Sequence, residues 1–303
     1  MSTRGLALAL LSSLTFGMSG VLAKPVMATG VTATQVTSAR IGISAVLLLA
    51  FVALARPRAL RFARRDWGLL VGYGLFGVIG APLLFFVSAA RIPVGIAMLL
   101  EFTAPILVAL WVRFVRKTRL AGAVWWGMAV ALLGLALVGE VWRSVQLDTV
   151  GVLAGLGSAV CTAAYYLLGE KAAGKHDPFG VLAVGMMVGA VVLAVLSPPW
   201  LVPMGRDTEL GPTWILLLGL AFVATAVAYL AGIVSLRHLS SSAASVIGLL
   251  EPLVATVLAW WLLGEALTVV QVAGAVVLLS GAAVVQVASS RTAAVVEPVP
   301  TPG

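Results

Sequence analysis

The sequence predicts an all-α membrane protein of ten transmembrane helices, arranged as two inverted repeats of five helices with both termini in the cytoplasm. Three observations lead to this fold class. Of the 303 residues, 61% are hydrophobic and only 10% are charged. The apolar residues fall into ten runs close to the length of about 20 residues that a bilayer requires. The chain also repeats at a constant offset of 147 residues.

The composition excludes a water-soluble fold, because soluble domains carry about 25% charged residues. The lipid bilayer is therefore the expected surroundings of the chain. The apolar runs are expected to be helical, since a chain in lipid must satisfy its own backbone hydrogen bonds. Barrel strands would be about 10 residues long and would alternate polar with apolar residues, which these runs do not. The predicted spans are 5–23, 36–55, 67–89, 94–112, 121–139, 149–168, 179–197, 213–236, 242–263 and 269–288.

The distribution of positive charge predicts the orientation. With the amino terminus inside, 14 Lys and Arg residues fall in cytoplasmic segments and 4 in outer segments. Cytoplasmic loops carry such an excess. The net charge of +8 is explained in this way, so we expect no nucleic-acid partner. The expected location is the inner (plasma) membrane, as a multi-pass protein.

The repeat divides the chain into residues 1–140 and 149–288, each with five spans. Because five is an odd number, the two halves must be inserted in opposite directions, an arrangement that recurs in carriers. Residues 289–303 include three prolines and are expected to form a disordered cytoplasmic tail. Residues that match at the offset include Thr15 with Thr162, Lys24 with Lys171, Pro105 with Pro252, Gly127 with Gly274, and Gly134 with Gly281.

Two acids lie deep within predicted spans, Glu101 and Glu251. A charge at the centre of a membrane helix costs about 2.5–3.5 kcal/mol on insertion scales. A carboxyl group avoids this cost when it is protonated, a property that proton coupling requires. Glu251 matches Ala104 at the repeat offset, one helical turn from Glu101, so the acids are expected on comparable faces. They are candidates for binding a substrate ammonium group or a proton. The alternative is a structural hydrogen bond to a neighbouring helix.

Pro105 and Pro252 are expected to break or kink their helices, because proline removes a backbone donor. Such breaks can free carbonyl groups to face a polar cavity, or can serve packing alone. Arg40 lies near the outer end of its span and is a candidate for a substrate carboxylate. The competing interpretation, which the sequence favours, is that Arg40 extends to the lipid headgroups.

Several uncharged polar side chains also lie within the spans. Some are expected to line a cavity, and others to form hydrogen bonds between helices. The sequence does not separate the two sets. The candidates for substrate or proton binding are Thr15, Ser19, Tyr165, Tyr166 and Tyr229.

The residues predict no enzyme. Both histidines lie in predicted loops and Cys161 is the only cysteine, so no metal site is expected. No phosphate-binding loop is present in the sequence, and no nucleophile has an evident buried base. We therefore expect no cofactor.

The motifs resemble the drug/metabolite transporter superfamily, EamA type, over nearly the whole chain. Glu101-Phe102-Thr103-Ala104-Pro105 and Tyr165-Tyr166 are similar to the threonine/homoserine exporter branch. The other motifs that carry the resemblance are Phe16-Gly17, Lys24, Gly30-Val31-Thr32, Arg40, Arg91-Ile92-Pro93, Glu251-Pro252, Gly264-Glu265, Gly274 and Gly281. The resemblance implies a ten-helix secondary carrier that exports amino acids or related metabolites.

The leading hypothesis is an exporter of threonine-like or homoserine-like amino acids, coupled to protons and working by alternating access. Its partners would be a small-molecule substrate, the bilayer and protons. A carrier of drugs, other cations or other metabolites with the same fold is the first alternative. An intramembrane enzyme or a scaffold protein is a more remote one.

Overall fold

The computed structural model describes residues 2–143, 148–264 and 266–296. The first half contains the elements α1 (Thr3–Ala28), α2 (Ala33–Ala55), η1 (Pro57–Leu60), η2 (Arg64–Asp66), α3 (Trp67–Gly72), η3 (Tyr73–Gly80), α4 (Ala81–Ala89), α5 (Val94–Glu101), α6 (Ala104–Phe114), α7 (Gly122–Val138) and η4 (Val141–Arg143). The second half contains α8 (Thr149–Lys175), α9 (Pro178–Leu196), η5 (Pro199–Leu201), β1 (Asp207–Thr208), β2 (Gly211–Pro212), α10 (Thr213–Ala221), η6 (Phe222–Val227), α11 (Ala228–Ser235), α12 (Ser241–Gly248), α13 (Leu250–Leu263) and α14 (Val269–Val296).

The prediction of a ten-helix, all-α membrane protein is confirmed. Within the described residues, nine helical spans are long and apolar enough to cross a membrane, and α7 is a shorter apolar helix of 17 residues. Four of the spans are assembled from more than one element, because the helix changes form or breaks within the bilayer. The hairpin β1–β2 was not predicted, since strands of two residues have no pattern to read.

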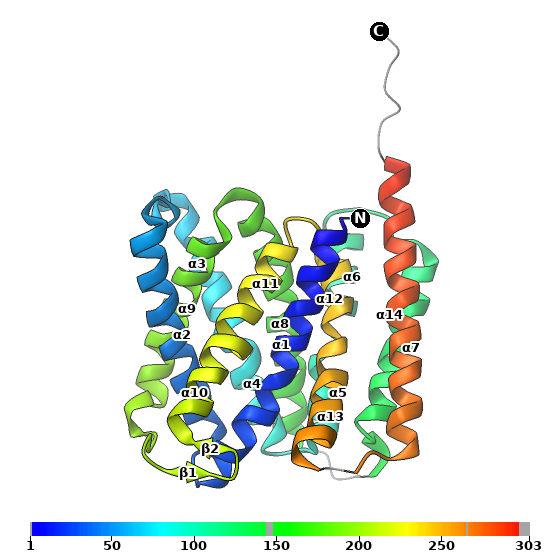
Figure 1. Cartoon of the computed structure of the whole chain (residues 1–303). Helices are drawn as coiled ribbons and strands as arrows, with labels where there is room; N and C mark the ends of the chain where they lie inside the picture. The colour runs from blue at the N-terminus through cyan, green and yellow to red at the C-terminus, as the bar shows by residue number, and fades with distance from the viewer. Residues whose placement is uncertain (1, 144–147, 265, 297–303) are drawn as a thin grey trace.

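The helices form one bundle (Figure 1). Helix α1 begins at the same end of the bundle at which α14 ends, and the hairpin β1–β2 lies at the other end. We call these the N-terminal end and the hairpin end. The sequence predicts that the termini are cytoplasmic, so that the N-terminal end faces the cytoplasm. This orientation stays a prediction.

The helix α14 runs further than the sequence predicted. Residues 289–296, expected in a disordered tail, continue the helix to Val296. The first proline of this segment is Pro298, so no residue before Val296 interrupts the helix. The rest of the predicted tail, 297–303, lies outside the described residues.

The two halves pack with the symmetry of the repeat. Helix α1 contacts α11 and α13 of the second half, and its repeat partner α8 contacts α4, α5 and α6 of the first half. The segments η3 and η6 are both π-helical, and the offset of 147 residues places η6 on residues 75–80 of η3. π-helical turns are rare and often mark functional sites. The sequence contained no signal for them.

Helices α7 and α14 pack through glycines that the repeat pairs. A β-carbon on Gly134 would overlap the backbone of Leu278 and lie 2.7 Å from the carbonyl oxygen of Gly274. A β-carbon on Gly127 would lie 2.8 Å from the carbonyl oxygen of Gly281. Small residues allow helix backbones to approach closely in membranes. Exchange of the two halves converts one contact into the other, as expected for a twofold relation between repeats.

Candidate functional site

A cavity of about 550 Å³ is lined by η3 and by the helices α1, α2, α4, α5, α8, α10, α11, α12 and α13. At one extreme it reaches Met27, Ala33 and Val94, which lie at or beside the hairpin ends of their helices. At the other extreme it reaches Ala9, Ala244 and Ser235, the last residue of α11, toward the N-terminal end. The cavity therefore extends from the hairpin end through the centre of the bundle.

Glu101 and Glu251 both line this cavity, each beside a helix break. Glu101 is the last residue of α5, and α6 begins at Ala104. Glu251 is the second residue of α13, which follows α12 after one intervening residue. The breaks precede Pro105 and Pro252, because a proline has no N–H to donate to the carbonyl four residues earlier. The carbonyls deprived in this way belong to residues 101 and 248, which the repeat offset pairs.

The two acids differ in their partners. The Thr162 hydroxyl donates a hydrogen bond of 3.3 Å to Oε1 of Glu101. Glu251 interacts electrostatically with both Glu101 and Arg40. One acid thus accepts a hydrogen bond from a hydroxyl of α8, and the other interacts with one like charge and one opposite charge.

Arg40 is in the cavity, and the interpretation that it extends to the headgroups is wrong. The residue is only 9% exposed and lines the same cavity as the acids. Its Nη1 donates a hydrogen bond of 2.6 Å to the hydroxyl of Ser19. The start of α2 points this side chain toward α1, so the guanidinium stays inside the bundle.

Aromatic rings form one wall of the cavity. The Tyr165 ring lies 5.0 Å from Tyr166 and 5.7 Å from Tyr229, and Phe16 lies 4.8 Å from Tyr229, in edge-to-face arrangements. The Tyr229 hydroxyl donates to the carbonyl of Gly77 in the π-helical segment η3, at 3.3 Å. These predicted residues therefore lie together and hold one another in fixed positions.

Gly248 explains why the second repeat has no acid at the position of Glu101. The offset places Gly248 on Glu101, and a β-carbon at Gly248 would overlap the hydroxyl of Tyr166. Tyr166 and Thr162 are one turn apart on α8, so this helix contacts the break of each half. The cavity is therefore asymmetric although the fold is repeated.

Three predicted residues do not line the cavity. Thr15 is buried, and its hydroxyl donates to the Leu11 and Ser12 carbonyls of its own helix. Pro105 and Pro252 are buried behind the breaks that they cause. Thr162, which was not a candidate, was detectable as the repeat partner of Thr15. The described residues contain no group of three or more His, Cys, Asp or Glu side chains that could hold a metal ion.

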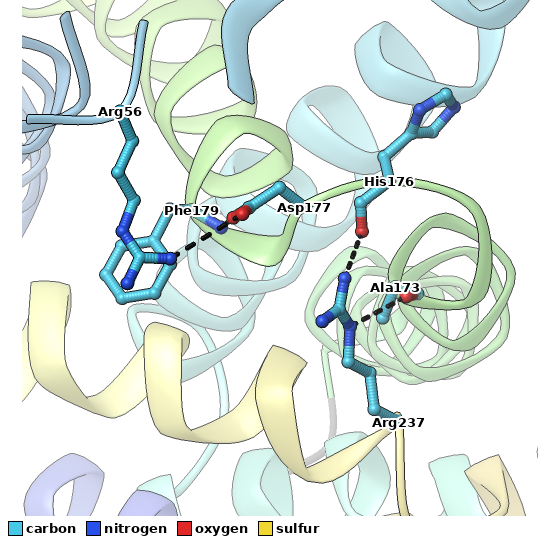
Figure 2. Close-up of polar contacts among 6 residues, drawn as sticks. All are labelled: Arg56, Ala173, His176, Asp177, Phe179 and Arg237. Atoms are coloured by element: carbon cyan, nitrogen blue, oxygen red, sulfur yellow. Dashed lines mark hydrogen bonds and ion pairs between the residues drawn. The ribbon is translucent and has the colours of Figure 1, made fainter. Parts of the chain in front are cut away.

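Polar contacts lie at the N-terminal end of the bundle, among residues that do not line the cavity. Figure 2 shows the Arg237 guanidinium between the carbonyl oxygens of Ala173 and His176, at 3.0 and 2.7 Å. Arginine in this position satisfies carbonyls at the end of α8. Nearby, Arg56 lies 4.3 Å from the centre of the Phe179 ring and 3.6 Å from Asp177.

Glu170 makes a second set of contacts at this end. Its Oε2 is 2.5 Å from Nη1 of Arg116, which follows α6. Its Oε1 accepts a hydrogen bond of 3.2 Å from the backbone N–H of Ser241, the first residue of α12. A negative charge is favourable at a helix N-terminus. One side chain of α8 therefore connects both broken helices at the N-terminal end.

Glu170→Gln is expected to increase opening of the N-terminal end about two- to five-fold, the effect of losing an ion pair worth about 0.5–1 kcal/mol. Glutamine can still accept from Ser241 but cannot pair with Arg116. The measurement is the labelling rate of a single cysteine at Ala9 (Ala9→Cys in Cys161→Ser) by an impermeant maleimide, in right-side-out and inside-out vesicles. Arg113→Gln, which removes a different charge near the end of α6, is the control. Equal labelling in all variants would show that Glu170 does not hold this end closed.

The chain is similar in sequence to known transporters. The chain matches the EamA-like transporter family over residues 3–139 and 149–287. It is 32% identical over 243 residues to the threonine/homoserine exporter RhtA of Salmonella typhimurium (strain LT2), covering 78% of this chain and 76% of the relative. RhtA of Escherichia coli (strain K12) is 31% identical over 242 residues, with the same coverage. An uncharacterized transporter of Bacillus subtilis (strain 168), YwfM, is 29% identical over 83% of this chain and 82% of its own.

A solved crystal structure superposes with a TM-score of 0.79 over 96% of this chain and 99% of its own, at 18% identity, which supports the fold. The predictions of a membrane transporter, and of a function other than catalysis, are confirmed by the family match over both halves. The chain is a multi-pass membrane protein that belongs to the EamA-like transporter family of the drug/metabolite transporter superfamily.

Proposed function

We propose that this chain is a secondary-active exporter of threonine-like or homoserine-like amino acids, or of related small metabolites, across the inner (plasma) membrane. The observation that carries the proposal is the placement of two carboxylates and one guanidinium on a single cavity within the bundle. Charged groups in membrane spans are costly and usually mark a substrate or ion pathway. An amino acid carries one positive and one negative group, and this site offers a partner for each.

The mechanism would be alternating access. With the orientation predicted from the charge distribution, the hairpin end would face outward, and the cavity would then be that of the outward-open state, in which an exporter releases its substrate. The two repeats would then rock against each other to open the N-terminal end. The ion pair between Glu170 and Arg116, which joins the two halves, would have to break in that step.

Proton coupling would follow from competition at the acids. A carboxylate that holds a substrate ammonium group is ionised, whereas a protonated carboxyl has no charge to offer it. A proton arriving from the outside at Glu101 or Glu251 would therefore release the substrate. The protonated carrier would return to the inward-open state, lose the proton and bind the next substrate.

A carrier of hydrophobic cations is the second candidate, and the aromatic wall favours it. Cations are attracted to the faces of aromatic rings, and Phe16 and the three tyrosines border the same space as the acids. In such a carrier, the buried positive charge of Arg40 would repel the cationic substrate and weaken its binding. The placement of Arg40 therefore favours amino acids.

The test is efflux of labelled threonine and homoserine from loaded cells with the wild-type protein, with the Glu101→Gln/Glu251→Gln variant, and with neither. We expect faster efflux with the wild type only, and a change in that efflux when a protonophore is added. Wild-type efflux equal to that of cells without the protein would contradict the substrate assignment. A parallel screen of cationic dyes distinguishes the second candidate.

A further inference from the structure

The buried guanidinium group of Arg40 has an N–H donor that makes no hydrogen bond within the protein. The residue is nine-tenths buried, and Nη1 donates to Ser19. The Nε atom is buried and has no hydrogen-bond partner. A guanidinium has five N–H donors in a fixed, planar arrangement. Leaving such donors unpaired away from water costs free energy, so an unpaired buried donor calls for an explanation.

The cavity borders Arg40, so a ligand in it can approach the guanidinium group. Ser19 and Arg40 both line the cavity, on α1 and α2. Glu251 interacts electrostatically with Arg40, but no carboxylate oxygen of the described residues lies within the 4.0 Å of an ion pair with it. Glu251 therefore offsets the charge of Arg40 without satisfying its donors.

We propose that Arg40, positioned by Ser19, is the binding site for the carboxylate group of the substrate. The site would take the substrate as a zwitterion, with the carboxylate at Arg40 and the ammonium group toward Glu251 and Glu101. This assignment rests on the proposed function and makes it more specific: the cargo must have a free carboxylate, so amino alcohols, amides and esters of the same amino acid are excluded. Arginine is suited to this role because its planar fork matches a carboxylate with two parallel hydrogen bonds.

A carboxylate fits the charge of the site better than a phosphate does. Among the described residues that line the cavity, Arg40 is the only one with a cationic side chain, and two acids face the same space. A dianionic phosphate would meet one positive and two negative groups. A carboxylate with its own ammonium group brings one charge of each sign, which suits a guanidinium on one side and carboxylates on the other.

The competing explanation is that Arg40 only balances the charge of Glu251 and orders α1 against α2. The two explanations differ in their chemistry. A structural arginine would affect every cargo alike, because it acts through the shape of the cavity. A carboxylate-binding arginine affects only cargo that has a carboxylate.

The experiment compares threonine with threoninol, in which a hydroxymethyl group replaces the carboxylate. Purified protein in liposomes is assayed for labelled threonine transport in the presence of either unlabelled compound. With the wild-type protein, we expect unlabelled threonine to inhibit transport of the label at a concentration about tenfold or more lower than threoninol does. This factor corresponds to a hydrogen bond to a charged group. In Arg40→Gln, this preference should disappear. Arg40→Lys should retain part of it, because lysine keeps the charge but lacks the fork. Arg91→Gln, at the hairpin end and outside the cavity lining, should retain all of it.

A second measurement tests the carboxylate site at Arg40 if threonine is not transported, or if Arg40→Gln transports too little for the comparison. It is the melting temperature of the purified wild type, Arg40→Lys and Arg91→Gln with a panel of amino acids, hydroxy acids and simple carboxylates, each paired with its alcohol. Stabilisation of the wild type and Arg91→Gln by a carboxylate but not by its alcohol, reduced in Arg40→Lys, supports the site even without threonine transport. Threonine transport with equal competition by threoninol would overturn this assignment and leave the proposed function standing. No carboxylate-specific stabilisation in the panel, together with no threonine transport, would overturn both.

Discussion

Glu251→Gln is expected to reduce threonine efflux by about tenfold or more while leaving the fold intact. Glutamine has the shape of glutamate but can neither ionise nor exchange a proton. Glu251 lies on the cavity directly after the break between α12 and α13 and interacts with the charges of Glu101 and Arg40. The loss of a hydrogen bond to a charged group is worth about 1.5–3 kcal/mol, and each 1.4 kcal/mol corresponds to a factor of ten.

The measurement is the initial rate of efflux, normalised to the amount of folded protein in the membrane. Glu101→Gln is expected to show a similar loss, since Glu101 lines the same cavity and is held by Thr162. Glu209→Gln is the matched control, because Glu209 is exposed in the hairpin β1–β2. A Glu251→Gln protein that transports at the wild-type rate would remove this acid from the mechanism.

Gly134→Ala is expected to destabilise the protein by about 1–3 kcal/mol or more, the usual cost of inserting a methyl group into a packed core. The new β-carbon would overlap the backbone of Leu278 in α14. Backbone atoms cannot rotate away as a side chain can, so the two helices would have to separate. Gly281→Ala should have a similar effect, since its β-carbon would overlap the backbone of Ala131.

The melting temperature of the purified variants measures this effect. Gly122→Ala is the control on the same helix, because a β-carbon at Gly122, the first residue of α7, has no neighbour within 4 Å. Alanine is favoured over glycine in helices, so this control should melt at or above the wild-type temperature. If Gly134→Ala also melts at the wild-type temperature, α7 and α14 are not packed as closely as described.

The ten helices were predictable because membrane insertion imposes a length and an apolar composition that a single sequence shows. The repeat was predictable because prolines and glycines recur at one offset. In the structure, the paired residues occupy equivalent positions in the two halves. Pro105 and Pro252 each follow a helix break. Gly134 meets Gly274, and Gly127 meets Gly281, between α7 and α14.

The composition of the cavity was only partly predictable. Depth in the membrane identified Glu101 and Glu251, because the cost of an ionised group there is large whichever way it points. The direction of Arg40 was not readable, since an arginine one turn from a helix end can reach headgroups or the interior equally well. Thr15 and Thr162 are equivalent in the repeat, yet only Thr162 contacts an acid. That difference arises from the packing of one half against the other. A repeat in the sequence shows which residues are equivalent, but it does not show which residues are in contact.

The most direct test of proton-linked amino-acid export is the internal pH of liposomes that contain the purified protein and a trapped pH dye. Threonine is added outside at equal starting pH, with the membrane potential clamped. Exchange of threonine for protons predicts a pH rise inside the liposomes with the wild type, and none with Glu101→Gln/Glu251→Gln. Threonine uptake without any change in internal pH would contradict proton exchange at these two acids.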